Sequence, residues 1–496
     1  KKTVDGFYDG DGAYKVRFMP SFTDEYTFEI EASFDINAGE ELPNEEALEH
    51  KRGIADGGKN AEKCAVRNML TGSFTVTPPS ADNHGPVRVA GTYYLAYEDG
   101  TPYHCIGTTC YVWNLQNEEL QKQTLKTLEE NAFNKIRFCI FPKHYDYNLH
   151  EPITYPYEGT PCDSSVLNEN NFAEYNGCAP GNDWDFTRFN PAHFQHIEKC
   201  IQALMNLGIE ADLIVMHPYD RWGFSMMKAE DDDRYWKYVL ARFSAYRNVW
   251  WSLANEYDLM HEKTLSDWER YAGIICEKDP YHHLRSIHNC KAYYDYNLPW
   301  ITHCSVQRTE TYRSSELVNE WREKYHKPVI LDEICYEGNI QFGWGNISGE
   351  EMTRRFWEAF CRGGYPGHGE TYLSPDRILW WSHGGVLHGT SPDRIRFLAK
   401  IMEETPGLGV EPMPCKWDEV ACRAAGFPAR KDYFIYYYSF MRPGFRDFYF
   451  DDTTEYQVEI IDTWEMTVTD GGIHKGKFRV KLPGKEYMAV RLQIAK

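Results

Sequence analysis

The chain has 496 residues, 42% hydrophobic and 26% charged, which is enough for about two to four globular domains. Its formal charge of −21 argues against nucleic acid and anionic membranes as partners, because both need patches of Lys and Arg. No stretch approaches the ~20 consecutive apolar residues of a membrane helix. The composition therefore indicates an ordinary globular protein.

The cysteines indicate the compartment. The chain has 14 of them, scattered and often beside apolar residues, as is typical of buried free thiols. Cys105 and Cys110 have no second pair at zinc-ligand spacing, so we expect no metal site. No secretory leader is present, which favours a cytoplasmic protein; the chain starts at Lys1 without Met, so a secreted or periplasmic protein with a trimmed leader is the alternative.

Three regions follow one another along the chain. In residues 1–90, apolar and polar residues alternate between turn residues, as at Tyr14, Val16 and Phe18, which predicts an N-terminal immunoglobulin-like β-sandwich. Residues 91–405 alternate strands with amphipathic helices. Residues 406–496 follow a Pro- and Gly-rich linker and return to strand patterns, which predicts a small C-terminal β-sandwich.

The middle region predicts a (β/α)8 TIM barrel. Eight strands are expected near residues 103–107, 135–141, 210–216, 250–256, 284–287, 301–306, 328–333 and 378–381. Helix signals lie between most of them, such as Asn190 and Pro191 at a start and Gly208 at a stop. Only the connection before the sixth strand is too short for a full helix. The predicted fold is thus an α/β barrel flanked by β-sandwich domains.

Two predicted strands end in glutamate. The run Trp250-Trp251-Ser252-Leu253-Ala254-Asn255-Glu256 and the run Pro328-Val329-Ile330-Leu331-Asp332-Glu333 are apolar until their last residues. Strands of a barrel carry chemistry at their carboxyl ends, and ionised Glu is rarely buried without a reason. A pair of carboxylates is what glycoside hydrolysis requires. We therefore assign Glu256 as acid/base and Glu333 as nucleophile.

Six further residues are predicted to bind substrate. Arg137, within the second strand, is expected to pair with Glu333 and keep it ionised, since a nearby cation lowers a carboxylate pKa. The others are Asn255, beside the acid/base; His217 and His288, at strand ends; and Trp380 and Trp381, one of which should face the barrel interior. The reaction needs no metal and no cofactor.

The two strand ends and the strand-two Arg resemble the signature of clan A (β/α)8 glycosidases. The opening segment Val4-Asp5-Gly6-Phe7-Tyr8-Asp9-Gly10 narrows the resemblance to bacterial apiosidase-like proteins with an N-terminal β-sandwich and a small C-terminal β domain, often labelled endoglucanases. That resemblance implies a strand-six Tyr beside the nucleophile. Here that strand has none, which leaves His303 or Gln307 to take its place.

Together these features predict a retaining O-glycosidase that acts on a plant-type oligosaccharide or glycoconjugate. The long connection 142–190 is expected to form one side of the site. A site closed on one side favours exo action, because a pocket accepts a chain end rather than the middle of a polysaccharide. An endo-β-glucanase-like enzyme and a non-catalytic carbohydrate-binding protein on a barrel scaffold are the alternatives, and a homo-oligomer is compatible with the sequence.

Overall fold

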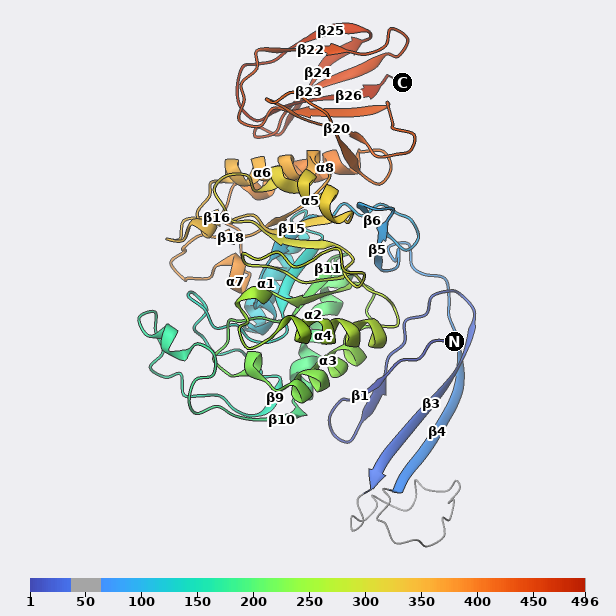
Figure 1. The fold of residues 1–496 in the computed structure, drawn as a ribbon, viewed down its shortest axis with the longest axis vertical. Helices are drawn as coiled ribbons and strands as arrows, with labels where there is room; N and C mark the ends of the chain where they lie inside the picture. The colour runs from blue at the N-terminus through green and yellow to red at the C-terminus, as the bar shows by residue number, and fades with distance from the viewer. Residues whose placement is uncertain (37–63, 496) are drawn as a thin grey trace. The chain divides into compact units, whose positions relative to one another are not determined.

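The computed structural model describes residues 1–36 and 64–495. Eight parallel strands form its central barrel (Figure 1). In chain order they are β7 (Gly107–Thr109), β8 (Lys135–Cys139), β11 (Glu210–Met216), β12 (Val249–Ala254), β13 (Arg285–Ser286), β14 (Cys304–Gln307), β15 (Val329–Glu333) and β17 (Tyr365–His368). Each strand pairs with its neighbour, and a parallel bridge between His288 and Ser305 joins β13 to β14 and closes the ring. The predicted TIM barrel is confirmed.

Helices surround the barrel. They are α1 (Glu118–Glu129), α2 (Pro191–Asn206), α3 (Ala229–Phe243), α4 (Leu265–Lys278), α5 (Val318–Tyr325), α6 (Gly349–Cys361), the short α7 (Trp380–His383) and α8 (Ser391–Glu403). The predicted start of α2 is confirmed, because the Asn190 side chain accepts a hydrogen bond from the Ala192 N–H and Pro191 follows it. No helix lies between β13 and β14 in the described chain, as expected. No described helix is long and apolar enough to cross a membrane.

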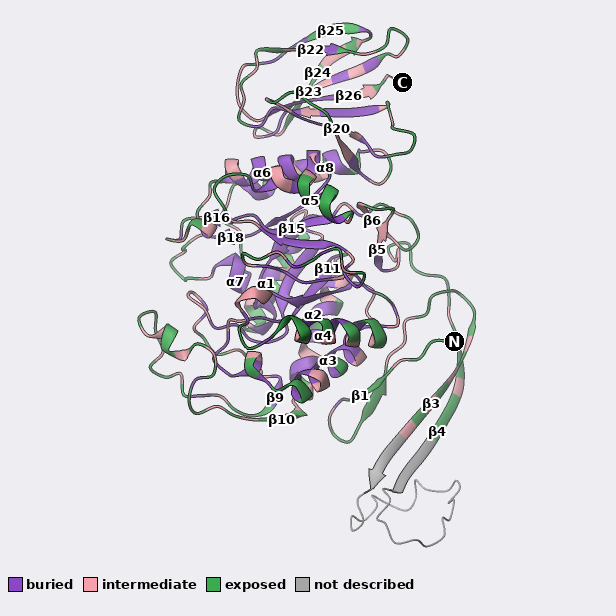
Figure 2. Ribbon diagram, viewed as in Figure 1, coloured by how far each residue is buried: buried purple, intermediate pink, exposed green. Residues whose placement is uncertain are grey.

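Burial explains why the barrel strands read as continuous apolar runs. All residues of β8, β11, β12 and β15 are buried. Figure 2 shows β11 and β15 in the buried colour, whereas parts of several surrounding helices are exposed. Parallel strands covered on both sides have no solvated face, so the two-residue alternation disappears. The described cysteines form no disulfides, in agreement with the free thiols predicted.

The predicted eighth strand is wrong. Residues 378–381 do not form a strand; Trp380 begins α7, and the eighth barrel strand is β17, Tyr365–His368. Its sequence, Tyr-Pro-Gly-His, lacks the β-branched residues that mark strands. Gly367 is required there, because a Cβ would lie 2.7 Å from the carbonyl oxygen of Leu331 on β15. The close approach of the two backbones therefore requires a residue that is unfavourable in strands, and the strand could not be recognised from its sequence.

The N-terminal region forms hairpins in its described residues. They are β1 (Gly6–Tyr8) with β2 (Tyr14–Val16), β3 (Glu25–Ile36) with β4 (Cys64–Thr75), and β5 (Val87–Ala90) with β6 (Tyr94–Tyr97). Residues 20–83 are a compact unit of their own, whereas residues 1–19 belong with the barrel. Within the latter unit, Asp9 pairs with Arg242 of α3 at 2.7 Å. Each of these hairpins is a separate two-stranded sheet among the described residues, and the predicted sandwich over residues 1–90 stays a prediction because residues 37–63 lie outside the description.

The C-terminal region is a sheet packed on a hairpin. The six-stranded antiparallel sheet comprises β19 (Val410–Met413), β20 (Val420–Ala424), β21 (Tyr433–Tyr437), β23 (Tyr456–Asp462), β24 (Thr467–His474) and β26 (Met488–Ile494), and the hairpin is β22 (Phe445–Tyr449) with β25 (Lys477–Lys481). Side chains from both, such as Phe434 and Phe448, form one buried apolar cluster. Trp357 of α6 packs on Tyr437 with ring centroids 5.6 Å apart, so this domain rests on the helices beside β15 and β17.

Candidate active site

The two predicted catalytic glutamates lie at the carboxyl ends of barrel strands. Glu333 is the last residue of β15, and Glu256 follows β12 by two residues. Their exposed fractions are 7% and 6%, so both carboxylates are nearly enclosed by protein. Buried carboxylates need specific partners, and the surrounding side chains supply them.

Glu333 is held by a cation and a phenol. Nη1 of Arg137 lies 3.3 Å from Glu333 Oε1, and the Tyr111 hydroxyl donates a hydrogen bond to the same oxygen. Nε2 of His288 lies 3.8 Å away. Tyr111, just beyond β7, therefore fills the role expected of a strand-six residue. His303 instead packs on Trp250, with ring centroids 5.5 Å apart.

The expected pairing of Arg137 with Glu333 is confirmed, but the predicted net effect on the pKa is wrong. Burial and the nearby Glu256 carboxylate raise the pKa of Glu333 above its ordinary value. The cations of Arg137 and Lys143 and the Tyr111 hydroxyl lower that pKa, and they offset only part of the rise. Arg137 thus limits an increase rather than producing a decrease.

Glu256 is held by three donors. Nε2 of Gln307 donates to Oε1 at 2.8 Å, the Tyr219 hydroxyl donates to Oε2, and Nδ2 of Asn255 lies 3.4 Å from Oε2. The backbone of Glu256 has φ 52°, in the left-handed region that side-chain-bearing residues adopt infrequently. Such conformations persist where the surroundings fix them and are common at functional sites. Gln307, considered above as a partner for Glu333, serves the other carboxylate.

Asn255 connects the two halves of the site. Its Oδ1 accepts a hydrogen bond from Arg137 Nη2 at 3.1 Å and lies 3.1 Å from the Tyr111 hydroxyl, while its amide faces Glu256. The chain of contacts from Glu256 through Asn255 and Arg137 to Glu333 fixes the relative position of the two carboxylates. Such prior placement is the condition for efficient proton transfer and attack.

A charged layer inside the barrel supports Arg137. Lys135 Nζ lies 2.7 Å from both Asp212 and Asp332, and Arg137 Nε lies 3.8 Å from the same two carboxylates. All four side chains are at most 4% exposed, and their formal charges balance. Asp332 is therefore a structural residue that orients the base of the site.

The two histidines occupy different positions. His288 is fully buried beside Glu333, and burial, with a further contribution from Arg137, lowers its pKa well below the ordinary value. His217 lies 3.3 Å from the Phe141 carbonyl oxygen, and burial lowers its pKa to about 3. Both rings are therefore neutral near pH 7. His288 therefore lies beside Glu333, whereas His217 contacts the backbone after β8, and direct substrate contact stays a prediction for each.

Only one of the paired tryptophans faces the catalytic residues. Trp381 packs edge-on against Tyr111, with ring centroids 5.6 Å apart, and lies 5.1 Å from Trp344. Trp380 donates from Nε1 to Thr108 Oγ1 at 2.9 Å and belongs to the main apolar core. The position of Trp381 supports its predicted role in sugar binding, and that of Trp380 does not.

Lys143 is the most prominent residue that sequence reasoning missed. Its ammonium lies 3.5 Å from the ring centroid of Tyr111, 4.3 Å from that of Tyr219 and 4.6 Å from that of Trp381. Burial lowers its pKa to about 8, against the opposing effect of neighbours that include Glu256 and Glu333. No hydrogen bond joins this ammonium to another described residue, so its N–H groups are available to a ligand.

A shared signal could have located the missed residues. Tyr111, Lys143 and Tyr219 all lie within four positions of the carboxyl end of a barrel strand. Polar residues at that edge point toward the mouth of a barrel whichever strand carries them. The two phenols and the lysine at that edge were not among the residues predicted from the sequence.

The fold and this site define a class: a (β/α)8 glycoside hydrolase, with its two carboxylates at the ends of the fourth and seventh barrel strands. The chain belongs to the apiosidase-like family, whose catalytic domain matches residues 90–397. Residues 1–33 and 417–493 match two further families, each described only as a domain of unknown function.

Solved structures agree with this assignment. A candidate glycoside hydrolase from Bacteroides vulgatus is 35% identical, with a TM-score of 0.82, over 100% of this chain and 93% of the other. A family 5 glycoside hydrolase from Bacteroides vulgatus is 16% identical, with a TM-score of 0.62, over 83% of this chain and 93% of the other, which shows a common fold. No protein of curated function matches the chain.

Proposed function

We propose that this glycoside hydrolase is a retaining O-glycosidase that acts by double displacement on a terminal sugar of a plant-type oligosaccharide or glycoconjugate. The observation that carries the proposal is the pair of buried carboxylates, Glu256 and Glu333, connected through Asn255 and Arg137. The pair has unlike partners: Glu333 contacts a cation and a phenol, whereas Glu256 contacts neutral donors. Unlike environments suit two carboxylates with different tasks.

In the first step, the Glu333 carboxylate attacks the anomeric carbon while Glu256 gives its proton to the departing glycosidic oxygen. The sugar is then bound to Glu333 through an ester, and the remainder of the substrate leaves as an alcohol. In the second step, Glu256 takes a proton from water, the water oxygen attacks the anomeric carbon, and the bond to Glu333 breaks. Two inversions leave the configuration of the sugar unchanged.

Enclosure of the site supports exo action. Lys143 and Tyr145, from the beginning of the long connection 142–190, pack with Trp344 and Trp381 beside Tyr111 and Tyr219, the phenols that bind the carboxylates. Aromatic side chains on several sides of the carboxylates favour a site for a chain end over an open cleft for a polysaccharide. The apiosidase-like family description supports a terminal sugar of a plant glycoside as the substrate.

The proposal is tested by the configuration of the first product. A panel of aryl glycosides (glucoside, galactoside, xyloside, arabinoside, fucoside and apioside) identifies the sugar, and proton NMR during the first turnovers identifies the anomer released. We expect release of a single terminal sugar with retained configuration. Initial release of the opposite anomer would rule out double displacement, and release of internal fragments from a β-glucan would show endo action. Inactivity toward both the panel and natural oligosaccharides that bind would favour a non-catalytic binding protein.

Lys143 gives a separate prediction about pH. We expect kcat/KM to fall above pH about 8, because Lys143 then loses the charge with which it would bind a substrate oxygen. In Lys143→Met the part of this alkaline fall that the lysine causes should disappear, and KM should rise about tenfold. The acid limb should move to higher pH, since the cation lowers the pKa of Glu333.

The pH profiles of kcat and KM measure these changes, with Lys122→Met, an exposed lysine of α1, as the matched control. An unchanged alkaline limb in Lys143→Met would show that another group titrates there.

A further inference from the structure

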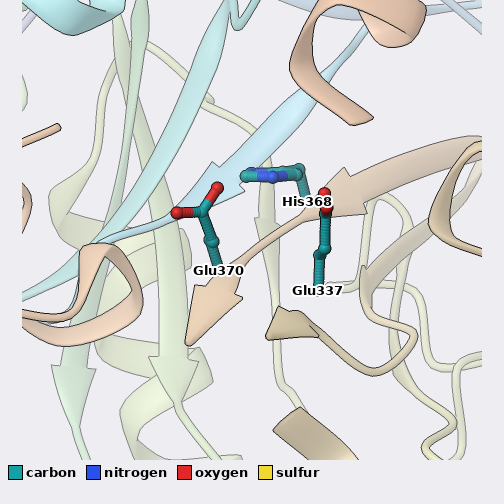
Figure 3. A group of neighbouring side chains, drawn as sticks. All are labelled: Glu337, His368 and Glu370. Carbon is teal, nitrogen blue, oxygen red and sulfur yellow. The ribbon is translucent and has the colours of Figure 1, made fainter. Parts of the chain in front are cut away.

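A second cluster of ligand-type side chains lies beyond the seventh and eighth barrel strands. Glu337 on β16 (Glu337–Gly338), His368 at the end of β17 and Glu370 on β18 (Glu370–Thr371) are at most 1% exposed. One ligand atom from each residue lies within 4.8 Å of the others. Figure 3 shows the two carboxylates on either side of the His368 imidazole.

The carboxylates are bound by backbone donors rather than by cations. Glu370 accepts hydrogen bonds from the N–H groups of His388 and Gly389, at 2.5 and 2.8 Å. Glu337 accepts from those of Thr390 and Ser391, at 2.7 and 3.0 Å. Among the described residues no Lys or Arg forms an ion pair with either carboxylate. Two buried acids are therefore brought together with no positive side chain between them, so either one of them holds a proton or a cation joins them.

His368 adds an unused lone pair at the same place. Its Nδ1 lies 3.2 Å from Thr108 Oγ1, an oxygen that also accepts the Trp380 N–H. Its Nε2 is buried and has no hydrogen-bond partner within the described chain. With Nδ1 donating to Thr108, Nε2 presents a lone pair to the space it shares with the carboxylates. Fixing one ring nitrogen by a hydrogen bond so that the other is free to bind is the usual arrangement of a metal-binding histidine.

Gly389 shows that the two carboxylates face one point. A Cβ at this position would lie 2.5 Å from Glu337 Oε2 and 2.7 Å from Glu370 Oε2. Any other residue would push into both oxygens, so the loop before α8 can approach them only as glycine.

We propose that Glu337, His368 and Glu370 bind one divalent cation. A donor set of one imidazole and two carboxylates suits Zn²⁺ or Mn²⁺ better than Ca²⁺, which prefers an all-oxygen shell. The ion would join β16, β17 and β18 to the loop that precedes α8. Through Thr108 and Trp380 it would also steady α7, which carries Trp381 beside the catalytic residues. This site was not expected from the sequence, where only the cysteines were considered as metal ligands.

The test begins with metal content. Full-length protein is purified, analysed by mass spectrometry for metals, stripped with a chelator, and titrated with Zn²⁺, Mn²⁺, Ca²⁺ and Mg²⁺ separately. We expect one equivalent of Zn²⁺ or Mn²⁺ per chain, a fall of a few degrees in Tm on stripping, and recovery on adding that ion back. If none of the four ions binds tightly and Tm responds to none of them, the proposal is overturned.

Variants locate the ion. His368→Gln and Glu370→Gln should each lose the equivalent of metal and the response of Tm to it. Glu210→Gln is the matched control, because Glu210 is also a buried carboxylate but lies on β11, bonded to Trp250. In case the cluster variants fail to fold, Co²⁺ bound to the stripped wild type reports ligand type through its visible spectrum. Metal that binds equally well to a folded His368→Gln variant, or a Co²⁺ spectrum without a nitrogen ligand, would contradict the site.

Discussion

Glu333→Gln is expected to lower kcat by about 10⁴-fold or more, the size of loss typical when a covalent nucleophile is removed. The amide has the shape of the carboxylate and can still accept from Arg137 and Tyr111 through its oxygen, so the site should keep its structure. It cannot form the ester with the anomeric carbon. The loss should appear in kcat with every glycoside in the panel, whatever its leaving group, because attack by Glu333 precedes every later step.

Azide distinguishes loss of the nucleophile from general damage. In Glu333→Ala the side chain leaves space for azide, which should attack the anomeric carbon directly and yield a glycosyl azide of inverted configuration. Glu310→Gln, which changes an exposed acid beyond β14, should retain the wild-type rate. A Glu333→Gln variant within tenfold of the wild-type rate would show that another group is the nucleophile.

Much of the candidate site could be predicted because it depends on local sequence. Strands β12 and β15 are buried on both faces, so they appear as apolar runs, and the acids that end them stand out. Arg137 and Asn255 were found for the same reason, as polar residues within or directly after such runs. All four residues contact one another as a connected group in the structure.

Other parts depend on contacts between distant segments, which no local pattern reveals. Tyr111 and Lys143 lie beyond different strands, and their roles follow from the side chains that meet them across the barrel mouth. The eighth strand was missed because its Pro and Gly fit close backbone packing rather than strand propensity. The pKa of Glu333 rises because burial and Glu256 outweigh the cation beside it, and that balance requires coordinates.

The unlike partners of the two glutamates also predict how the acid/base variant will behave. Glu256→Ala should lower kcat/KM by about 10²–10⁴-fold for natural glycosides, whose alcohol leaving groups require a proton. Activated aryl glycosides, such as dinitrophenyl glycosides, need little protonation, so their first step should be nearly unaffected. The second step also loses its base, and a rapid burst of aryl alcohol followed by slow turnover should therefore be seen.

The dependence on leaving group separates this role from that of Glu333. A plot of log(kcat/KM) against leaving-group pKa should be steeper for Glu256→Ala than for wild type. Azide should restore turnover of this variant and form a glycosyl azide of retained configuration, because it attacks the sugar ester on Glu333. Glu262→Gln, an exposed acid in the same loop, provides the control. If kcat/KM of Glu256→Ala falls by the same factor with activated and unactivated glycosides, Glu256 does not supply the proton. Gln307 and Tyr219, which hold Glu256, would then position a residue that binds the sugar.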